Sequence, residues 1–317
     1  MPNKLRYLIY LLRIRRVEFR IAEIPILLIP IILLVNDTKV FRTFSFWEGI
    51  FIFFLLFAFG DMINCLADRD LDAVYKPHLS EAVYGLGVPF VKFQVAATAA
   101  LALVLTAHLA YQLQRWELLG LVAVGLALGA GYSVKPVQFK GRGLAQLFCL
   151  WLIIFVGPML FVGFLISSLP STEMVLFAAA FGALQMGIIL VNTAEDYPED
   201  LEAGIRTSIV ALGLRRGIKL AFRLTVGGAI GLIGALGFMF QRRSLPPIWL
   251  LMMLPAILTC VYVLVDIGKL KSLIAKQGLP DAIATVKRSA KKVPLWLTAV
   301  AWTTVIACLA FFIAGKQ

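Results

Sequence analysis

The sequence predicts an all-α membrane protein with nine transmembrane helices, and three observations indicate this fold class. First, 61% of the 317 residues are hydrophobic and 15% are charged, whereas soluble domains are about half apolar and a quarter charged. Second, nine apolar runs approach the roughly 20 residues that a helix needs to cross a bilayer. Third, Lys and Arg are concentrated on one side of these runs.

The apolar runs are separated by short polar segments, and we expect residues 1–317 to form a single domain. No small-residue cleavage site follows the first run, so we interpret it as a retained helix rather than a secretory signal. The four cysteines have no paired spacing, which argues against a disulfide framework or a zinc site. In chain order the runs are residues 21–35, 44–64, 91–111, 117–134, 144–168, 174–194, 220–240, 246–266 and 293–315.

The placement of Lys and Arg predicts the orientation in the membrane. With an odd number of spans, the N-terminus and the even-numbered connections share one side, and most of the 30 Lys and Arg residues fall there. Short loops rich in Lys and Arg stay cytoplasmic, so we expect a cytoplasmic N-terminus. This bias accounts for the net charge of +12, which is therefore no evidence for a nucleic acid partner. The basic N-terminal segment is suited to contact anionic membrane lipid.

The second apolar run ends in a series of oxygen-bearing side chains. Asn64, Asp68 and Asp72 are spaced four residues apart, and Asp61 lies three residues before Asn64. On a helix these spacings place all four side chains along one stripe. Stacked carboxylates repel one another, so we expect a cation to compensate them. Mg²⁺ fits, because it takes oxygen ligands and commonly bridges carboxylates to phosphate.

The sixth run ends in a similar series. Asn192, Asp196 and Asp200 repeat the spacing of four, at the same cytoplasmic end. An alternative is that interfacial acids merely cap helix ends and face water. That alternative explains one such series more readily than two with matching spacing, so we favour a metal site to which both contribute.

Between the two series lies a short loop that is rich in turn-forming and basic residues. It begins at Tyr132 and contains Lys135, Lys140 and Arg142. These cations could bind phosphate oxygens. Basic residues in a cytoplasmic loop also satisfy the topology rule without any ligand, so a phosphate role depends on the neighbouring acidic series.

In these residues the chain resembles the UbiA superfamily of intramembrane prenyltransferases. That family has Asn-x-x-x-Asp-x-x-x-Asp in its second span and Asp-x-x-x-Asp in its sixth, which Asn64/Asp68/Asp72 and Asp196/Asp200 match. The loop from Tyr132 to Gly143 resembles the loop between the family's fourth and fifth spans. Gly204 and Thr207 resemble the usual continuation of the second motif.

The resemblance implies a nine-helix bundle around a central cavity that opens to lipid. It also implies Mg²⁺-dependent ionisation of an isoprenyl diphosphate and transfer of the prenyl group to a lipophilic acceptor. The implied metal ligands are Asn64, Asp68, Asp72, Asp196 and Asp200. The expected catalytic residues are Asp68, Asp72, Asp196, Asp200, Lys140 and Tyr132, and the expected substrate-binding residues are Asn64, Asn192, Lys135, Arg142, Lys76 and Gln185. The candidates for the cavity lining are Phe57, Phe148, Trp151, Phe155, Met159, Gln185 and Met186.

The chain departs from the pattern of members that prenylate aromatic acceptors. Cys65 stands where many of them have Asp, and Lys76-Pro77 where they have Arg-Pro. His78 or Glu81 could serve as a base. Three functions therefore stay open: prenyl transfer, intramolecular cyclisation by a membrane terpene cyclase, and transport of an anionic solute. Acidic residues at one end of the spans, rather than at the midplane, argue against transport.

Overall fold

The computed structural model describes residues 4–314, and in this range it contains helices and no strand. The predicted all-α class is therefore confirmed. The chain divides into two compact units. Within the described residues, unit 1 comprises residues 4–23 and Thr38–Gln138, and unit 2 comprises Ile24–Asp37 and residues 139–314.

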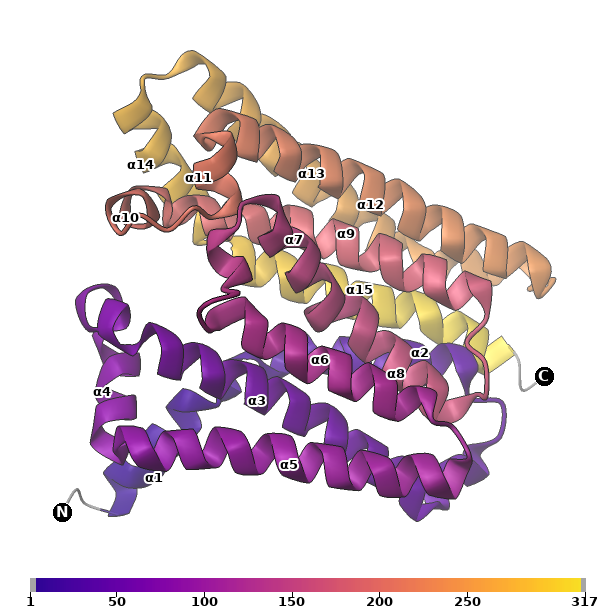
Figure 1. Ribbon diagram of the computed structural model, residues 1–317. Coiled ribbons are helices and arrows are strands. Elements are labelled where there is room, and N and C mark those ends of the chain that lie inside the picture. Colours follow the sequence, from indigo (N-terminus) through magenta and orange to yellow (C-terminus); the bar gives the residue numbers. More distant parts are fainter. Residues whose placement is uncertain (1–3, 315–317) are drawn as a thin grey trace. The chain divides into compact units, whose positions relative to one another are not determined.

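Unit 1 is built around one long helix, α3, which packs against α5 and α6 (Figure 1). Helix α4 lies across the end of α3 that carries the first acidic series, and α1 packs against α4. The elements of unit 1 are α1 (Lys4–Ile14), the 3₁₀ turns Val17–Phe19 and Thr38–Arg42, α3 (Phe44–Tyr75), α4 (Pro77–Leu86), α5 (Val88–Leu113) and α6 (Glu117–Ser133).

Unit 2 has α9, α12, α13 and α15 running alongside one another, with α10, α11 and α14 gathered at one end (Figure 1). Helix α2 (Arg20–Leu34) crosses the boundary between the units. A π-helical segment, Trp151–Val156, joins α7 to α8. The helices of unit 2 are α7 (Leu144–Leu150), α8 (Gly157–Ile166), α9 (Thr172–Glu195), α10 (Tyr197–Glu202), α11 (Ser208–Leu212), α12 (Leu214–Arg242), α13 (Leu254–Lys276), α14 (Leu279–Ala290) and α15 (Val293–Ala314), with 3₁₀ turns at Phe139–Gly141 and Pro247–Met253.

Helices occupy all nine predicted runs, and seven of them are long and apolar enough to cross a membrane within the described range. The other two runs correspond to α2 and α6, which have 15 and 17 residues. The prediction of nine spans is thus supported at seven positions and stays a prediction at two. The seven are Phe44–Tyr75, Val88–Leu113, Leu144–Ile166, Thr172–Glu195, Leu214–Arg242, Pro247–Lys276 and Val293–Ala314.

Helix α3 is longer than a membrane crossing requires. Its N-cap Thr43 accepts a hydrogen bond from the backbone N–H of Phe46 (3.3 Å), and the helix continues for 32 residues. At 1.5 Å per residue it is about 48 Å long, against about 30 Å of hydrocarbon. The acidic series therefore lies on the polar extension of a spanning helix rather than in a loop after it.

The close contact between α9 and α12 depends on glycine. A Cβ on Gly228 of α12 would overlap the backbone nitrogen of Leu184 in α9, whereas a Cβ on the adjacent Gly227 would meet nothing within 4 Å. Small residues allow this approach, which gives van der Waals contact where apolar burial alone does not drive helix association in lipid.

We predict that Gly228→Ala lowers the apparent melting temperature of the detergent-solubilised protein by several degrees. Overpacking of this kind costs about 1–3 kcal/mol, which exceeds the gain of up to about 1 kcal/mol from replacing glycine by alanine in a helix. Gly227→Ala is the matched control and should leave the melting temperature unchanged or raise it. Equal stability of the two variants would contradict the close contact.

Candidate functional site

The first acidic series lies on the last three turns of α3. Asn64 and Asp68 are partly exposed, and Asp72 is buried at 8% exposure. Asp70 points elsewhere: its carboxylate accepts a hydrogen bond from the Tyr84 hydroxyl of α4 and pairs with Arg69 (3.3 Å). A helix C-terminus carries partial negative charge, which disfavours acidic side chains there. The dipole of α3 therefore disfavours a negative charge on Asp72, which lies in the last turn of the helix.

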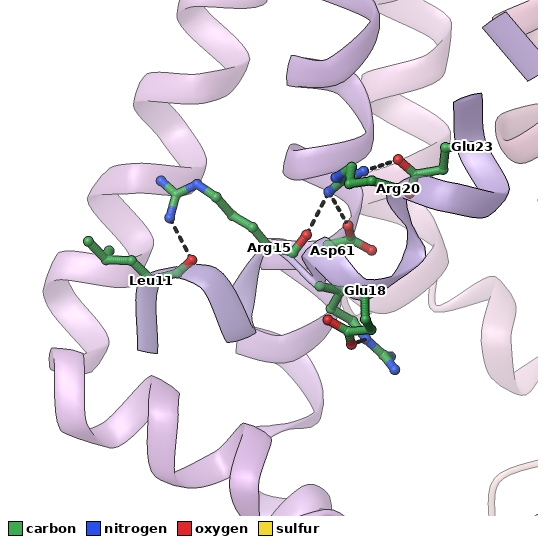
Figure 2. Close-up of polar contacts among 7 residues, drawn as sticks. Leu11, Arg15, Glu18, Arg20, Glu23 and Asp61 are labelled. Carbon is green, nitrogen blue, oxygen red and sulfur yellow. Dashed lines mark hydrogen bonds and ion pairs between the residues drawn. The ribbon is translucent and has the colours of Figure 1, made fainter. Parts of the chain in front are cut away.

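Asp61 was expected on the same stripe, and the structure gives it a different partner. The Asp61 Oδ2 atom lies 2.7 Å from Arg20 Nη2, and the same guanidinium donates to the Glu23 carboxylate through Nη1 (Figure 2). Arg20 Nη2 also donates to the backbone carbonyl of Arg15 (2.6 Å). The side chains of Arg20, Glu23 and Asp61 are only 20%, 8% and 18% exposed. We therefore assign Asp61 to this ion-pair cluster rather than to the ligand series.

Helix α4 begins directly after α3 and carries the residues considered as alternative bases. Lys76, at the junction, and His78 are exposed. Glu81 accepts a hydrogen bond from the Tyr10 hydroxyl (2.7 Å) and pairs with the Arg6 guanidinium. The Tyr10 hydroxyl and the Arg6 guanidinium together hold the pKa of Glu81 below its usual range. An efficient general base has a pKa near the operating pH, so Glu81 is better suited to clamping α1 onto α4.

The second acidic series is not on one continuous helix, contrary to the simple expectation from its spacing. Helix α9 ends at Glu195, Asp196 caps it, and α10 begins at Tyr197 with Pro198 in its first turn. The backbone N–H of Asp200 still bonds the Asp196 carbonyl (2.8 Å), so these two residues remain one turn apart. Asp200 is buried at 8% exposure and Asn192 is exposed.

The chain after the second series is held in a fixed turn. Gly204 adopts φ +66°, a conformation that favours glycine, and the Ile205 N–H bonds the Asp200 carbonyl (2.8 Å). Thr207 then caps α11 through its hydroxyl. The buried Gln146 of α7 accepts hydrogen bonds at Oε1 from both the N–H (2.8 Å) and the hydroxyl (2.6 Å) of Ser208.

The basic loop is attached to this turn. The Gly143 N–H donates to the Arg206 carbonyl (2.8 Å), so Lys140 and Arg142 belong to the segment that runs beside the continuation of the second motif. Lys140 is partly exposed and Arg142 is exposed. Tyr132 and Lys135, at the end of α6 and just after it, belong to unit 1.

Lys287 is a candidate that the sequence did not single out. It lies on α14, and its Nζ atom is 3.0 Å from Oε1 of Glu199, next to Asp200. The hydrogen bond to Glu199 raises the pKa of Lys287, and the charges of Glu195 and Asp196 add to this effect. In the sequence Lys287 belongs to a basic stretch between residues 269 and 292, whose charge by itself indicates only membrane orientation. Only the packing of α14 against α9 reveals that one of its cations faces the second series.

The expected lining residues in unit 2 are mostly enclosed. Phe155, Met159 and Met186 are buried, whereas Phe148 is 61% exposed. Gln185 is 2% exposed, and its Nε2 donates to the Leu297 carbonyl of α15 (3.3 Å). Its Oε1 is buried and has no hydrogen-bond partner among the described residues. An unsatisfied buried amide oxygen is available to a polar ligand group.

The side chains present are of the kind that binds Mg²⁺. The two series offer carboxylate and amide oxygens, and Asp72 and Asp200 are each shielded from water. Within residues 4–314 no group of three or more His, Cys, Asp or Glu side chains is close enough to form a complete metal cage. Mg²⁺ commonly binds through one or two carboxylates together with water and substrate phosphate, and this donor set fits that arrangement.

A comparison with protein families gives a match over most of the chain. Residues 24–264 match the model of the UbiA prenyltransferase family. The chain belongs to the UbiA prenyltransferase family. The expectation from the acidic motifs is thus confirmed, and the matched range contains both of them. A comparison with curated proteins found no match.

Solved structures show that this family member has the UbiA fold. A structure described as digeranylgeranylglyceryl phosphate synthase in membranes aligns with a TM-score of 0.66 at 16% identity, covering 96% of this chain and 99% of that one. A UbiA homolog from Archaeoglobus fulgidus bound to DMAPP and Mg²⁺ aligns with a TM-score of 0.62 at 17% identity, covering 92% and 99%. The same homolog bound to GPP and Mg²⁺ gives a TM-score of 0.60 at 17% identity, with the same coverage.

We predict that Arg20→Met destabilises this UbiA family member strongly. The substitution leaves the poorly exposed carboxylates of Glu23 and Asp61 without their cation, and breaking a buried ion pair costs about 3–5 kcal/mol. The apparent melting temperature in detergent measures the effect. Arg16→Met is the matched control, because the Arg16–Glu18 pair (3.3 Å) has a 54% exposed carboxylate and exposed pairs contribute about 0–1 kcal/mol. If the two variants have the same apparent melting temperature, the cluster of Arg20, Glu23 and Asp61 does not stabilise the fold.

Proposed function

We propose that this protein is a Mg²⁺-dependent membrane prenyltransferase that ionises an isoprenyl diphosphate and transfers the prenyl group to a lipophilic acceptor. The observation that carries the proposal is the pair of acidic series, Asn64/Asp68/Asp72 at the end of α3 and Asp196/Asp200 at the junction of α9 and α10. Both lie in the range that matches the family. UbiA homolog structures bound to DMAPP or GPP with Mg²⁺ support the substrate class and the metal.

The acidic side chains would hold the metal. The proposed ligands, either directly or through water, are Asn64, Asp68, Asp72, Asp196 and Asp200. When bound, Mg²⁺ supplies positive charge that stabilises the departing diphosphate. Asp72 lies in the last turn of α3, where the helix dipole is unfavourable to a carboxylate, so metal binding would also offset that unfavourable interaction.

Basic and polar side chains would bind and activate the leaving group. We assign Lys140 and Tyr132 to stabilising the charge that develops on the diphosphate, by a cation and a hydroxyl donor. Substrate binding is assigned to Asn64, Asn192, Lys135, Arg142, Lys76 and Gln185. Lys287 is proposed as a further cation for the second series, because its ammonium group already neutralises Glu199.

The chemistry breaks the allylic C–O bond, and both bonding electrons leave with the diphosphate oxygen. The allylic cation then forms a new bond with a nucleophilic atom of the acceptor, which loses its proton. Buried apolar side chains such as Phe155 and Met159 would exclude water, and an aromatic face stabilises a cation electrostatically. Without exclusion of water the cation would be hydrolysed to an alcohol.

We further propose that the whole chain works as one integral membrane domain with nine spans, α2 and α6 included. Most Lys and Arg residues lie on the side of the two acidic series, so the N-terminus and the active site are assigned to the cytoplasm.

Transport of an anionic solute is a weaker proposal, since the acidic residues gather at helix ends. Cyclisation by a membrane terpene cyclase would share the ionisation step with prenyl transfer. It differs only in the nucleophile, which would be a double bond of the substrate itself instead of an acceptor.

We predict that Asp68→Asn and Asp196→Asn each reduce Mg²⁺-dependent release of diphosphate by roughly 100-fold or more, because each removes a charge that holds the metal at the leaving group. The substrates are geranyl, farnesyl and geranylgeranyl diphosphate together with a pool of quinone precursors, aromatic acids and lipid alcohols as acceptors, and the readout is free diphosphate. Asp70→Asn is the matched control: it lies on the same helix but bonds Tyr84. It should keep wild-type turnover. Retained turnover in either of the first two variants would exclude the metal assignment.

Transfer to an acceptor predicts a specific pattern of products. Purified protein in nanodiscs should release little diphosphate with Mg²⁺ alone and should form prenylated product when quinone precursors, aromatic acids and lipid alcohols are added. EDTA should abolish this product and Mg²⁺ restore it. Mass spectrometry identifies the products. Cyclic hydrocarbon or alcohol formed without acceptor would make the protein a cyclase, and inactivity throughout would favour transport.

A further inference from the structure

The N-terminal helix α1 presents an apolar face that no described part of the chain covers. Leu5, Leu8, Ile9 and Leu12 are 63%, 52%, 38% and 43% exposed. Their spacing of three and four residues places them on one side of the helix, within an arc of about 100°. We call these four residues the leucine face.

The opposite side of α1 is firmly packed on unit 1. Tyr10 and Ile14 are 3% and 0% exposed, and the Tyr10 hydroxyl donates to Glu81 of α4 (2.7 Å). The ring of Tyr7 contacts that of Phe90 in α5, with centroids 6.0 Å apart. Because α1 already has a packed side, the leucine face is a second apolar surface of the same helix.

The leucine face is bordered by three cations of α1, and the acidic side chain beside them is Glu81 of α4, which pairs with Arg6 and lies 4.0 Å from Arg13. Lys4 lies on one edge, and Arg6 and Arg13 lie on the other. The Arg6 and Arg13 side chains are 60% and 40% exposed. The first acidic residue in the sequence is Glu18, after the helix has ended. With three cations against one carboxylate the border keeps a net positive charge, and a leucine surface with such a border is complementary to acyl chains beneath anionic headgroups.

The length of α1 decides between spanning a bilayer and lying on it. Eleven residues reach about 16 Å, half of the hydrocarbon thickness. We propose that α1 lies in the membrane interface, with the leucine face among the acyl chains and Lys4 and Arg13 at the phosphate groups of anionic phospholipid. The occupant of this surface is the lipid bilayer itself, on the side that carries negative charge.

Helix α1 connects the proposed lipid contact to the first acidic series through α4. Arg6 and Tyr10 hold Glu81 of α4, and α4 starts at Pro77, directly after α3 ends at Tyr75. A bilayer contact that fixes α1 therefore also fixes the segment following Asp72. This last step rests on the proposed function, whereas the lipid contact does not.

The test places a fluorophore on the leucine face of the full-length protein in nanodiscs. All four native cysteines are buried, so a thiol-reactive bimane attaches selectively to Leu8→Cys. Asp281→Cys, on the exposed polar start of α14, is the reference position. With nitroxide-bearing lipid in discs that contain phosphatidylglycerol, we expect quenching at position 8 to be roughly threefold greater than at position 281.

The charge dependence is tested with matched double variants. In the Leu8→Cys background, Lys4→Gln/Arg13→Gln should raise the fraction of phosphatidylglycerol needed for half-maximal quenching, since each basic side chain near an anionic surface contributes roughly a fivefold preference. Lys39→Gln/Arg42→Gln removes the same charge from the 3₁₀ turn Thr38–Arg42, which precedes the opposite end of α3, and should change nothing.

Two results would overturn the proposal. Equal quenching at positions 8 and 281 would show that the leucine face does not meet lipid, and strong quenching that ignores phosphatidylglycerol would show that the headgroup charge is irrelevant. Neither readout needs catalysis. Failure of the prenyl transfer assays would leave the lipid contact standing, and failure of the quenching assays would leave the proposed reaction standing.

Discussion

A backbone inside hydrocarbon must satisfy its own N–H and C=O groups, and the rest of this structure depends on that constraint. Helices achieve it locally, so the described chain is helical throughout and its irregular segments are short. Polar chemistry is then confined to the ends of the helices or their extensions. The 32 residues of α3 illustrate this, since the helix continues past its apolar run and carries Asn64, Asp68 and Asp72 on the extension.

Charges near a medium of low dielectric need partners, and ion pairs between separate segments supply several of them here. Arg20 with Asp61 and Glu23, and Arg6 with Glu81, tie separate segments of unit 1 together. Lys287 with Glu199 places a cation beside the second acidic series. The first two groups hold segments of unit 1 together, and the third holds α14 against the start of α10.

The two acidic series also differ in backbone, although their spacing is the same. The first lies on a continuous helix, and Asp72 is buried against its surroundings. The second bends at Asp196, where α9 ends and α10 starts with a proline in its first turn. Because α10 starts at the bend, Glu199 and Asp200 lie in its first turn. Negative charge is favoured there by the helix dipole. The bend therefore gives the second series a different backbone setting from the first, although both have the same spacing in sequence.

The sequence by itself determined the helical class, the places of the apolar runs and the two acidic series, because apolar length and spacings of four residues are local properties that any helix preserves. The family match confirms what the motifs indicated. Only the tertiary structure decided which cation each carboxylate meets. Arg20 and Asp61 are 41 residues apart, Arg6 and Glu81 are 75 apart, and Lys287 and Glu199 are 88 apart. Such pairs follow from how helices pack, and no local pattern encodes that packing. For the same reason Asp61, which fits the stripe of the first series in sequence, belongs to an ion-pair cluster in the fold.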